Sequence, residues 1–334
     1  MNEELTSPRN APYILGMRAM LFAIAVGNTA ILKGSELSPR CFWVLGQALT
    51  QAGLPAGVVN ILYHRPQDAA EVTTALINHP SIKKINFTGS TAVGSIIGGQ
   101  AGKALKPVLM ELGGKASAIV CSDANIFKAA TQCAVGAFMH SGQICMSTER
   151  ILVSSDILDP FRTALQGAIS HVFPSHTPAV LVQSAGVEKN KRLIKDAVSK
   201  GAKVIHGDHE KDEISETRMA PIVIEGTTKE MDLFYTESFG PSVSLVPFNT
   251  DEEAIAMAND TEYGLSGAVF TENLGRGLKI AKSIETGAVH INSMSVHDEA
   301  ALPHGGTKKS GWGRFNARWG LEEFLRLKTI TYQV

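Results

Sequence analysis

The stretch Lys84-Ile-Asn-Phe-Thr-Gly-Ser-Thr91 decides the fold class, because it joins a short apolar strand to the start of a helix through a glycine. A strand is predicted over Lys84–Thr88, and Gly89 opens the helix that follows. Farther along, Val108–Leu112 is again typical of a strand. Strands separated by helices of about 10–15 residues predict βαβ units, in which the strands lie parallel in one sheet.

The same alternation extends in both directions from this stretch. Upstream, Ser38–Gly53 and Gln67–Asn78 have the spacing of helices, and Val58–Tyr63 has that of a strand. The chain after Gly113-Gly114 continues the pattern. Strands are predicted at Ala116–Val120, Arg150–Val153, Ser242–Phe248, Gly267–Phe270 and Ala288–Asn292, and helices at Ile126–Met139, Asn190–Lys200, Asp251–Ala258 and Asn273–Ile284. The predicted C-terminal elements are a helix at Leu321–Leu327 and a strand at Thr329–Val334. We therefore predict an α/β protein that divides at Gly113-Gly114.

Composition and charge exclude several classes of protein. The 334 residues carry 31 Lys and Arg against 32 Asp and Glu, so there is no basic excess to hold nucleic acid. Four cysteines without a CxxC pair indicate a reducing, cytoplasmic location. The ten histidines show neither HExxH nor paired Cys/His spacing, so no metal is expected. The apolar stretch Ile14–Leu32 contains Arg18 and Gly27-Asn28, which favour a buried helix over a membrane span.

Four side chains stand in settings that suit chemistry. Cys145 lies in the polar, glycine-bounded loop Ser141-Gly-Gln-Ile-Cys-Met-Ser147, where a thiol can act as a nucleophile; the alternative is an ordinary buried thiol. Glu111 ends an apolar run, so it is either a buried general base or a strand-end salt bridge. Glu237 precedes a tight turn, and Glu36 follows a strand where an acid can bind a ribose; each is otherwise a solvated acid.

With these pieces collected, the sequence resembles the aldehyde dehydrogenase superfamily. Seven motifs occur in the family's order and near its spacing, over almost the whole chain: Gly27-Asn-Thr-Ala-Ile-Leu-Lys33-Gly-Ser-Glu36, Gly53-Leu-Pro-Ala-Gly-Val-Val-Asn60, Phe87-Thr-Gly-Ser-Thr91, Glu111-Leu-Gly-Gly-Lys115, Gly142-Gln-Ile-Cys145, Glu237-Ser-Phe-Gly-Pro241 and Gly305-Gly-Thr-Lys-Lys-Ser-Gly311. The stretch from Asn10 to Ala19 looks most like the branch that contains salicylaldehyde and other aromatic-aldehyde enzymes.

The resemblance assigns roles residue by residue. It implies that Cys145 is the nucleophile that forms a thiohemiacetal and then a thioester, and that Glu111 activates the water that releases the acid. The oxyanion donors are the Cys145 backbone N–H and the Asn10 side chain. For the NAD cofactor, the resemblance implies that Glu237 and Phe239 hold the nicotinamide riboside, Lys33 and Glu36 the adenosine ribose, and Gly89 and Ser90 the pyrophosphate.

The resemblance also implies a domain plan and partners. Residues 1–113 correspond to the remainder of an NAD-binding domain with an incomplete Rossmann-type sheet, 114–318 to an α/β catalytic domain, and 319–334 to a C-terminal helix and a bridging strand. The expected substrate is an aldehyde, with neither nucleic acid nor membrane as a partner, and the expected assembly is a homodimer or homotetramer.

Three departures from the family pattern stand out, one of them a remodelled surface loop at His171–Gly186 that lacks the usual Gly-Asp-Pro and later Gly-Pro. Family chains carry a long segment before the position of Asn10, so we expect a truncated chain whose apolar helix Ala19–Val26 is incompletely covered and which aggregates or works weakly. His304 stands where Phe is usual before the double glycine. Two alternatives to the NAD-dependent dehydrogenase therefore stay open, namely an inactive truncated paralogue and a thiol esterase that runs only the Cys145 half-reaction.

Overall fold

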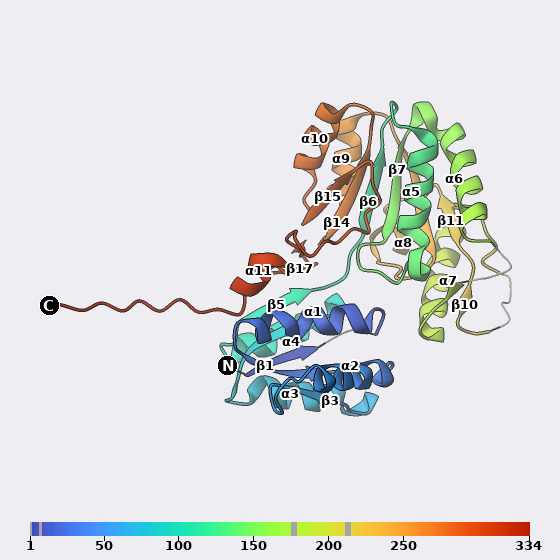
Figure 1. Ribbon diagram of the computed structural model, residues 1–334. Helices are drawn as coiled ribbons and strands as arrows, with labels where there is room; N and C mark the ends of the chain where they lie inside the picture. Colours follow the sequence, from blue (N-terminus) through green and yellow to red (C-terminus); the bar gives the residue numbers. More distant parts are fainter. Residues whose placement is uncertain (1, 7–8, 175–178, 211–214) are drawn as a thin grey trace. The chain divides into compact units, whose positions relative to one another are not determined.

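The computed structural model describes residues 2–6, 9–174, 179–210 and 215–334, and they fall into two compact units (Figure 1). The first unit comprises 1–112, 298–305 and 311–334, and the second comprises 113–297 and 306–310. The division falls at Leu112–Gly113, beside the predicted Gly113-Gly114. Two C-terminal segments that the sequence analysis assigned to later domains belong to the first unit, because 311–312 pair with strand β5 of that unit.

The first unit is a six-stranded sheet in the order β17-β5-β4-β1-β2-β3, parallel except for β17. Strand β1, which the sequence analysis did not anticipate, pairs with both β2 and β4. The elements are β1 Asn2–Thr6, α1 Pro12–Ala25, β2 Thr29–Lys33, α2 Pro39–Gln51, β3 Val59–Leu62, α3 Ala69–Asn78, β4 Ile82–Thr88, α4 Thr91–Lys103, β5 Val108–Glu111, β17 Gly311–Trp312 and α11 Ala317–Glu322.

Helices cover both faces of this sheet. Leu109 packs into a cluster with residues of α1 and α2, whereas its neighbour Met110 packs into a second cluster with residues of α3 and α4. Successive side chains of a strand point to opposite faces, so these two clusters lie on opposite sides of β5. The expected parallel α/β architecture is thus confirmed for this unit.

Helix α1 is covered on one face only, in agreement with the expected incomplete covering of Ala19–Val26. Ala19, Met20 and Ala23 are buried in the cluster that includes Phe42 and Phe315. The residues of α1 that stay exposed are Tyr13, Ile14, Leu21 and Ala25. The partners of the buried face come from distant segments, which local sequence cannot reveal.

The second unit is a seven-stranded sheet in the order β15-β14-β6-β7-β12-β11-β9, parallel except for the edge strand β9. Its sheet strands are β6 Ala116–Val120, β7 Thr148–Ser154, β9 Lys203–His206, β11 Ile222–Glu225, β12 Ser242–Phe248, β14 Ser266–Phe270 and β15 Ala288–Ile291. Its helices are α5 Ile126–Phe138, α6 Leu158–Val172, α7 Ser184–Ser199, α8 Asp232–Tyr235, α9 Asp251–Asn259 and α10 Leu274–Ser283. Two further strand pairs lie outside the main sheet: β8 Ala179–Val180 pairs with β10 Arg218–Met219, and β13 Tyr263–Gly264 pairs with β16 Thr307–Lys308.

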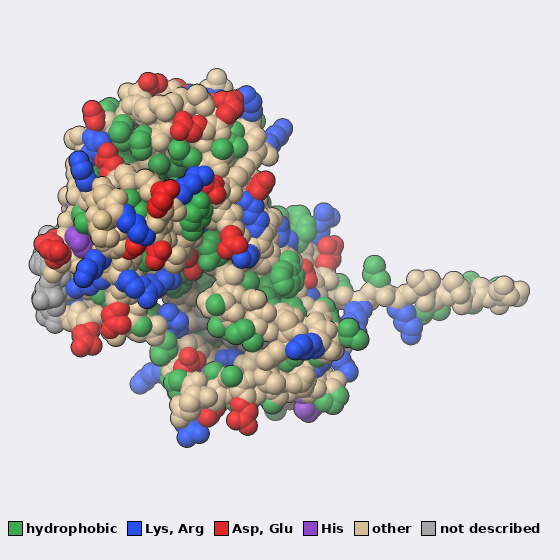
Figure 2. All heavy atoms as spheres, turned by 180° about the vertical axis from the view of Figure 1, so that it is seen from behind, with side chains coloured by type: hydrophobic (Ala, Val, Ile, Leu, Met, Phe, Trp, Pro, Cys, Tyr) green, Lys and Arg blue, Asp and Glu red, His purple; other side chains and the backbone are tan. Residues whose placement is uncertain are grey.

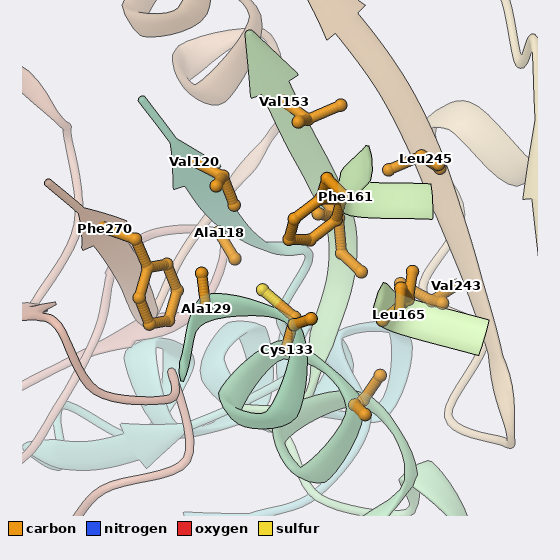
Figure 3. Close-up of a cluster of buried hydrophobic side chains, with 14 of the residues drawn as sticks. Ala118, Val120, Ala129, Cys133, Val153, Phe161, Leu165, Val243, Leu245 and Phe270 are labelled. Atoms are coloured by element: carbon orange, nitrogen blue, oxygen red, sulfur yellow. The ribbon is translucent and has the colours of Figure 1, made fainter. Parts of the chain in front are cut away.

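The core of the second unit is also two-sided. Figure 3 shows one cluster, in which Cys133 of α5 and the α6 residues Phe161 and Leu165 pack against Ala118 and Val120 of the sheet. The alternate β6 residues Ile119 and Cys121 instead enter a cluster with residues of α9 and α10. Helices therefore cover both faces of this sheet as well, and its loops emerge at the strand ends.

The C-terminus differs from the prediction. The closing helix spans Ala317–Glu322 rather than Leu321–Leu327, and Thr329–Val334 forms no strand. Residues 325–334 are exposed, and among the described residues no strand pairs with them. A strand needs a neighbour to satisfy its backbone hydrogen bonds, and β propensity alone does not supply one. Pairing of this segment in an oligomer stays a prediction.

The charged surface agrees with the balanced composition. On the face shown in Figure 2, Lys and Arg side chains are interspersed with Asp and Glu. Within the described ranges, no helix is long and apolar enough to cross a bilayer.

Gly114 supplies a test of the close packing at the start of β6. A Cβ at Gly114 would lie 2.2 Å from the backbone carbonyl oxygen of Cys145, so Gly114→Ala forces two backbone segments apart. We expect a loss of about 1–3 kcal/mol in the free energy of unfolding, measured in urea. The matched control is Gly167→Ala on α6, where nothing lies within 4 Å and a helix-favouring residue should be neutral or stabilising. Equal stability of the two variants would contradict the packing argument.

Candidate active site

In the first unit, several predicted residues lie at one edge of the sheet. The strand register places Thr88 opposite Glu111, and Thr6 opposite both Lys33 and Phe87. Lys33 and Glu111 thus end β2 and β5, and Gly89 follows β4, all at the carboxyl edge. In open α/β sheets, ligands bind at this edge of the strands.

The groups at this edge suit a dinucleotide. Ser90 caps helix α4, its Oγ accepting a hydrogen bond from the Val93 N–H at 3.4 Å, and the start of the helix is largely exposed. The positive end of a 13-residue helix favours a pyrophosphate. Lys33 Nζ lies 2.9 Å from His64 Nε2, and Glu36 is half-buried in the turn after β2. Together these groups can bind a dinucleotide: Lys33 and Glu36 offer a donor and an acceptor for ribose hydroxyls, and the start of the helix favours the phosphate groups.

Glu111 is completely buried and carries an ion pair. The Arg18 guanidinium binds its Oε2, and the same guanidinium lies 3.2 Å from Asp298 Oδ2. The structure therefore shows the salt bridge that the sequence left open as an alternative to a base, although Arg18 comes from a helix rather than the strand. A paired carboxylate is still able to take up a proton, so the pair does not exclude that role. Asn10 is half-buried in the bend before α1.

Three segments of the second unit meet for a topological reason. Gly114 precedes β6, the Cys145 loop precedes β7, and the loop Glu237–Pro241 precedes β12; the three strands are neighbours and parallel. Because parallel strands begin at the same edge of a sheet, the segments before them converge there. The 2.2 Å approach between a Gly114 Cβ and the Cys145 carbonyl oxygen confirms the contact.

The Cys145 loop is bent by three consecutive residues in the left-handed region. His140, Ser141 and Gly142 have φ of 52°, 60° and 69°. A Cβ on Gly142 would lie 2.1 Å from the Gly240 carbonyl oxygen, so only glycine permits this approach to the Glu237 loop. Backbone strain of this kind persists where surrounding contacts over-determine it, and it clusters at functional sites.

Glu149 connects the segments in this unit through its carboxylate. Its Oε1 accepts hydrogen bonds from the Ser238 N–H and hydroxyl, both at 2.8 Å, and from the Phe239 N–H at 3.1 Å. Its Oε2 accepts a 2.7 Å bond from Lys115 Nζ, which also donates to the Thr236 carbonyl at 2.8 Å. Glu149 and Lys115 are both buried, and their hydrogen bonds hold the backbone of the Glu237 loop in place.

Glu237 sits in a distinct electrostatic setting. Its carboxylate accepts a 2.8 Å hydrogen bond from the Gly114 N–H, which joins the loop to the glycine pair. Burial, helped by the nearby Glu149 carboxylate, raises the pKa of Glu237 to about 7, although the Gly114 bond and Lys189 oppose the shift. Above neutral pH the Glu237 side chain is therefore ionised and can only accept hydrogen bonds. It suits a ligand that offers hydroxyl groups as donors.

The four cysteines separate by environment. Burial raises the pKa of Cys121 to about 12 and that of Cys133 still more, so both stay protonated near neutral pH. Cys41 is half-buried in α2. Cys145 is half-buried in a turn rather than a helix or strand. Thiolates are the reactive form, which makes Cys121 and Cys133 poor nucleophiles.

Sequence reasoning missed several residues of these sites. It noted Arg18 only as an interruption of an apolar run, and it did not consider Asp298 or Glu149. The available signals were an arginine in an otherwise apolar helix and the charged pair Glu149-Arg150 inside a buried strand. Across the described ranges, no group of three His, Cys, Asp or Glu side chains is arranged to hold a metal ion.

The fold and these two sets of residues define the class of protein. The family model described as "Aldehyde dehydrogenase family" matches residues 5–330. The chain belongs to the aldehyde dehydrogenase family, whose members oxidise aldehydes.

Individual relatives support the aromatic-aldehyde branch. The chain is 41% identical over 333 residues to a vanillin dehydrogenase of Pseudomonas fluorescens, covering 98% of this chain and 68% of that protein. The crystal structure of a salicylaldehyde dehydrogenase from Pseudomonas putida G7 complexed with salicylaldehyde superposes with a TM-score of 0.92 at 38% identity, covering 100% of this chain and 70% of that one. A succinic semialdehyde dehydrogenase from Streptococcus pyogenes, in complex with NADP+, has a TM-score of 0.90 at 30% identity, covering 97% and 71%. The expected resemblance to the aromatic-aldehyde enzymes is confirmed.

The buried pair Lys115–Glu149 gives a prediction with a defined pH dependence. Glu149→Gln leaves the Lys115 ammonium buried without its counter-ion, so we expect a loss of about 3–5 kcal/mol in the free energy of unfolding at pH 7. Burial already lowers the pKa of Lys115, and the unfolded chain then binds more protons than the folded one. The variant should therefore regain stability as the pH rises from 7 toward 10.

The control is the double variant Lys115→Met with Glu149→Gln, which removes both partners. Replacing a buried pair is far less costly than breaking it, so the double variant should recover most of the loss. Urea unfolding at several pH values measures both effects. A double variant as unstable as the single one would show that the pair does not act as described.

Proposed function

We propose that this chain oxidises an aldehyde, of the aromatic class, to the carboxylic acid with NAD as the hydride acceptor. The observation that carries the proposal is the convergence of Gly114, the Cys145 loop and the Glu237 loop at the amino edge of β6, β7 and β12. A half-buried cysteine in a strained, glycine-bounded loop suits nucleophilic attack on a carbonyl carbon.

In the first step, the Cys145 thiolate attacks the aldehyde carbon and the carbonyl oxygen becomes an oxyanion. The Cys145 backbone N–H and the Asn10 amide are the proposed donors to that oxygen, and such donors act most strongly when they are fixed in advance. Two hydrogen bonds hold the backbone around Cys145: the Ser147 N–H donates to the Ile144 carbonyl at 2.8 Å, and the hydroxyl of the distant Ser295 donates to the Met146 carbonyl at 2.7 Å.

A bound nicotinamide coenzyme supplies the hydride acceptor, and Cys145 is left as a thioester. Glu237 and Phe239 are proposed to orient the nicotinamide riboside. Phe239 has a φ of +49°, and the bond from its N–H to Glu149 holds the backbone that carries the ring. Gly89 and Ser90 are proposed for the pyrophosphate, and Lys33 and Glu36 for the adenosine ribose.

Glu111 is proposed to remove a proton from the water that hydrolyses the thioester. A buried carboxylate is a stronger base than a solvated one once its counter-ion moves away, and Arg18 is shared with Asp298. The 25% exposed Asp298 side chain thus offers Arg18 an alternative partner when Glu111 accepts its proton. We also propose a homodimer or homotetramer as the working assembly.

The proposed base gives the decisive experiment. Glu111→Gln should produce one burst of NADH from benzaldehyde and NAD and then turn over about 10²–10⁴ times more slowly than the wild type, because hydride transfer proceeds while deacylation stalls. Stopped-flow absorbance measures both phases. Equal loss of the burst and of the steady state would contradict the base assignment.

Cys145→Ala is the accompanying control, and it should abolish both NADH formation and hydrolysis of nitrophenyl acetate in folded protein. Cys121→Ala should keep both activities. If the wild type hydrolyses the ester but never forms NADH, the chain is a thiol esterase; if it does neither while folded, it is an inactive paralogue.

Glu36 tests the choice of coenzyme. A carboxylate beside the ribose repels a 2′-phosphate, so we expect NAD to bind better than NADP, and Glu36→Gln to reduce that preference at least about tenfold, or about 1.4 kcal/mol. Glu71→Gln, an exposed acid on α3 of the same unit, is the matched control and should not change the ratio. Titration of intrinsic fluorescence with each coenzyme gives the two dissociation constants, and an unchanged ratio in Glu36→Gln would remove the argument.

A further inference from the structure

His304 is a buried imidazole that neither the fold nor the proposed reaction has used. Its backbone N–H and carbonyl both bond to Phe315, at 3.1 and 2.7 Å, so the residue is held in place by a two-bond bridge. The side chain is 7% exposed, and among the described residues Nε2 has no hydrogen-bond partner. A buried polar atom without a partner is costly and calls for a reason.

The ring lies between two carboxylates. His304 Nε2 is 3.7 Å from Glu111 Oε1, and Nδ1 is 3.8 Å from Asp298 Oδ1. Each separation exceeds a direct hydrogen bond by less than about 1 Å, so a small ring rotation or one bridging water closes it. Glu111 is fully buried, whereas the Asp298 side chain is 25% exposed, so the line from Glu111 through His304 to Asp298 runs toward solvent.

The other group bound to Glu111 cannot serve as a proton acceptor. Arg18 is a guanidinium with five donors and no acceptor, and it does not deprotonate in proteins. It fixes Glu111 and Asp298 in position, and its stacking 4.5 Å over the Phe315 ring holds it against the same residue that anchors His304. Of the two side chains Arg18 and His304 beside Glu111, only the His304 imidazole can accept a proton.

We propose that His304 is a positioning and proton-transfer residue that returns Glu111 to its basic form after each turnover, with Asp298 as the next acceptor. The proposal rests on the base role proposed for Glu111. The water proton taken up by Glu111 moves from Oε1 to His304 Nε2, and the Nδ1 proton passes to Asp298 Oδ1 and then to solvent. The ring is then neutral with its proton on Nε2, and the starting tautomer returns when the ring flips or when solvent takes the Nε2 proton and supplies one to Nδ1. No redox change is involved, and one proton leaves for each water consumed.

The test separates proton removal from hydride transfer. In His304→Phe, the NADH burst should stay within about twofold of the wild type, while acid release after the burst, followed by rapid chemical quench, should slow at least about tenfold. His304→Gln keeps a polar side chain of similar reach that cannot take up and release a proton near neutral pH, and it should show the same defect. Added imidazole should restore acid release in His304→Ala, because the shorter side chain leaves room for a diffusing base to replace the missing one.

The control is His206→Phe, a half-buried histidine on the edge strand β9, which should change neither phase nor respond to imidazole. Unfolding in urea checks that each variant is folded, and His304→Gln keeps the test valid if the larger Phe disturbs packing. Wild-type acid release in His304→Gln, joint loss of burst and acid release, or the absence of imidazole rescue would each overturn the proposal. A wild type that forms no NADH at all would instead refute the proposed function, which makes the two failures distinguishable.

Discussion

The direction of the parallel strands is the constraint on which both sets of functional residues depend. Strands that run the same way begin together at one edge of a sheet and end together at the other. In the first unit, residues that follow or end strands meet at the carboxyl edge, and these are Lys33, Gly89 and Glu111. In the second unit, residues that precede strands meet at the amino edge, and these are Gly114, Cys145 and Glu237.

Buried charge is the second organising feature of the molecule. In each unit a carboxylate is buried with a cation from another part of the chain, Glu111 with Arg18 and Glu149 with Lys115. Such buried ion pairs add little net stability, because the cost of removing both charges from water opposes their attraction. They nevertheless permit few alternative positions for the segments that carry the charges. Glu149 illustrates this, since four donors from two segments, Lys115 and the loop with Ser238 and Phe239, converge on its two oxygens. The loop that carries Glu237 and Phe239 is consequently held at defined backbone angles.

The backbone at Cys145 shows how glycine makes such convergence possible. Gly114 and Gly142 lie where a Cβ would overlap a carbonyl oxygen, at 2.2 and 2.1 Å. Both glycines belong to motifs that stand out in the sequence. Their role is to let two backbone segments come close together, not to make the chain flexible. The buried thiols of Cys121 and Cys133 show the contrasting case, in which burial raises the pKa and removes reactivity.

The sequence by itself determined the class of fold, most of the sheet strands and the seven motifs that mark the family, because apolar periodicity and glycine placement are local properties. Most helix and strand bounds agree within a few residues, as at Ala116–Val120 and Ser242–Phe248. Only the tertiary structure decided the covering of α1, the absence of a strand at Thr329–Val334, and the partners of Glu111. Arg18, Asp298 and His304 are separated from Glu111 by 93 residues or more, and the 280 residues between Arg18 and Asp298 carry no local sign of their contact. Long-range ion pairs and strand partners depend on how the chain folds back on itself, and that is settled by packing.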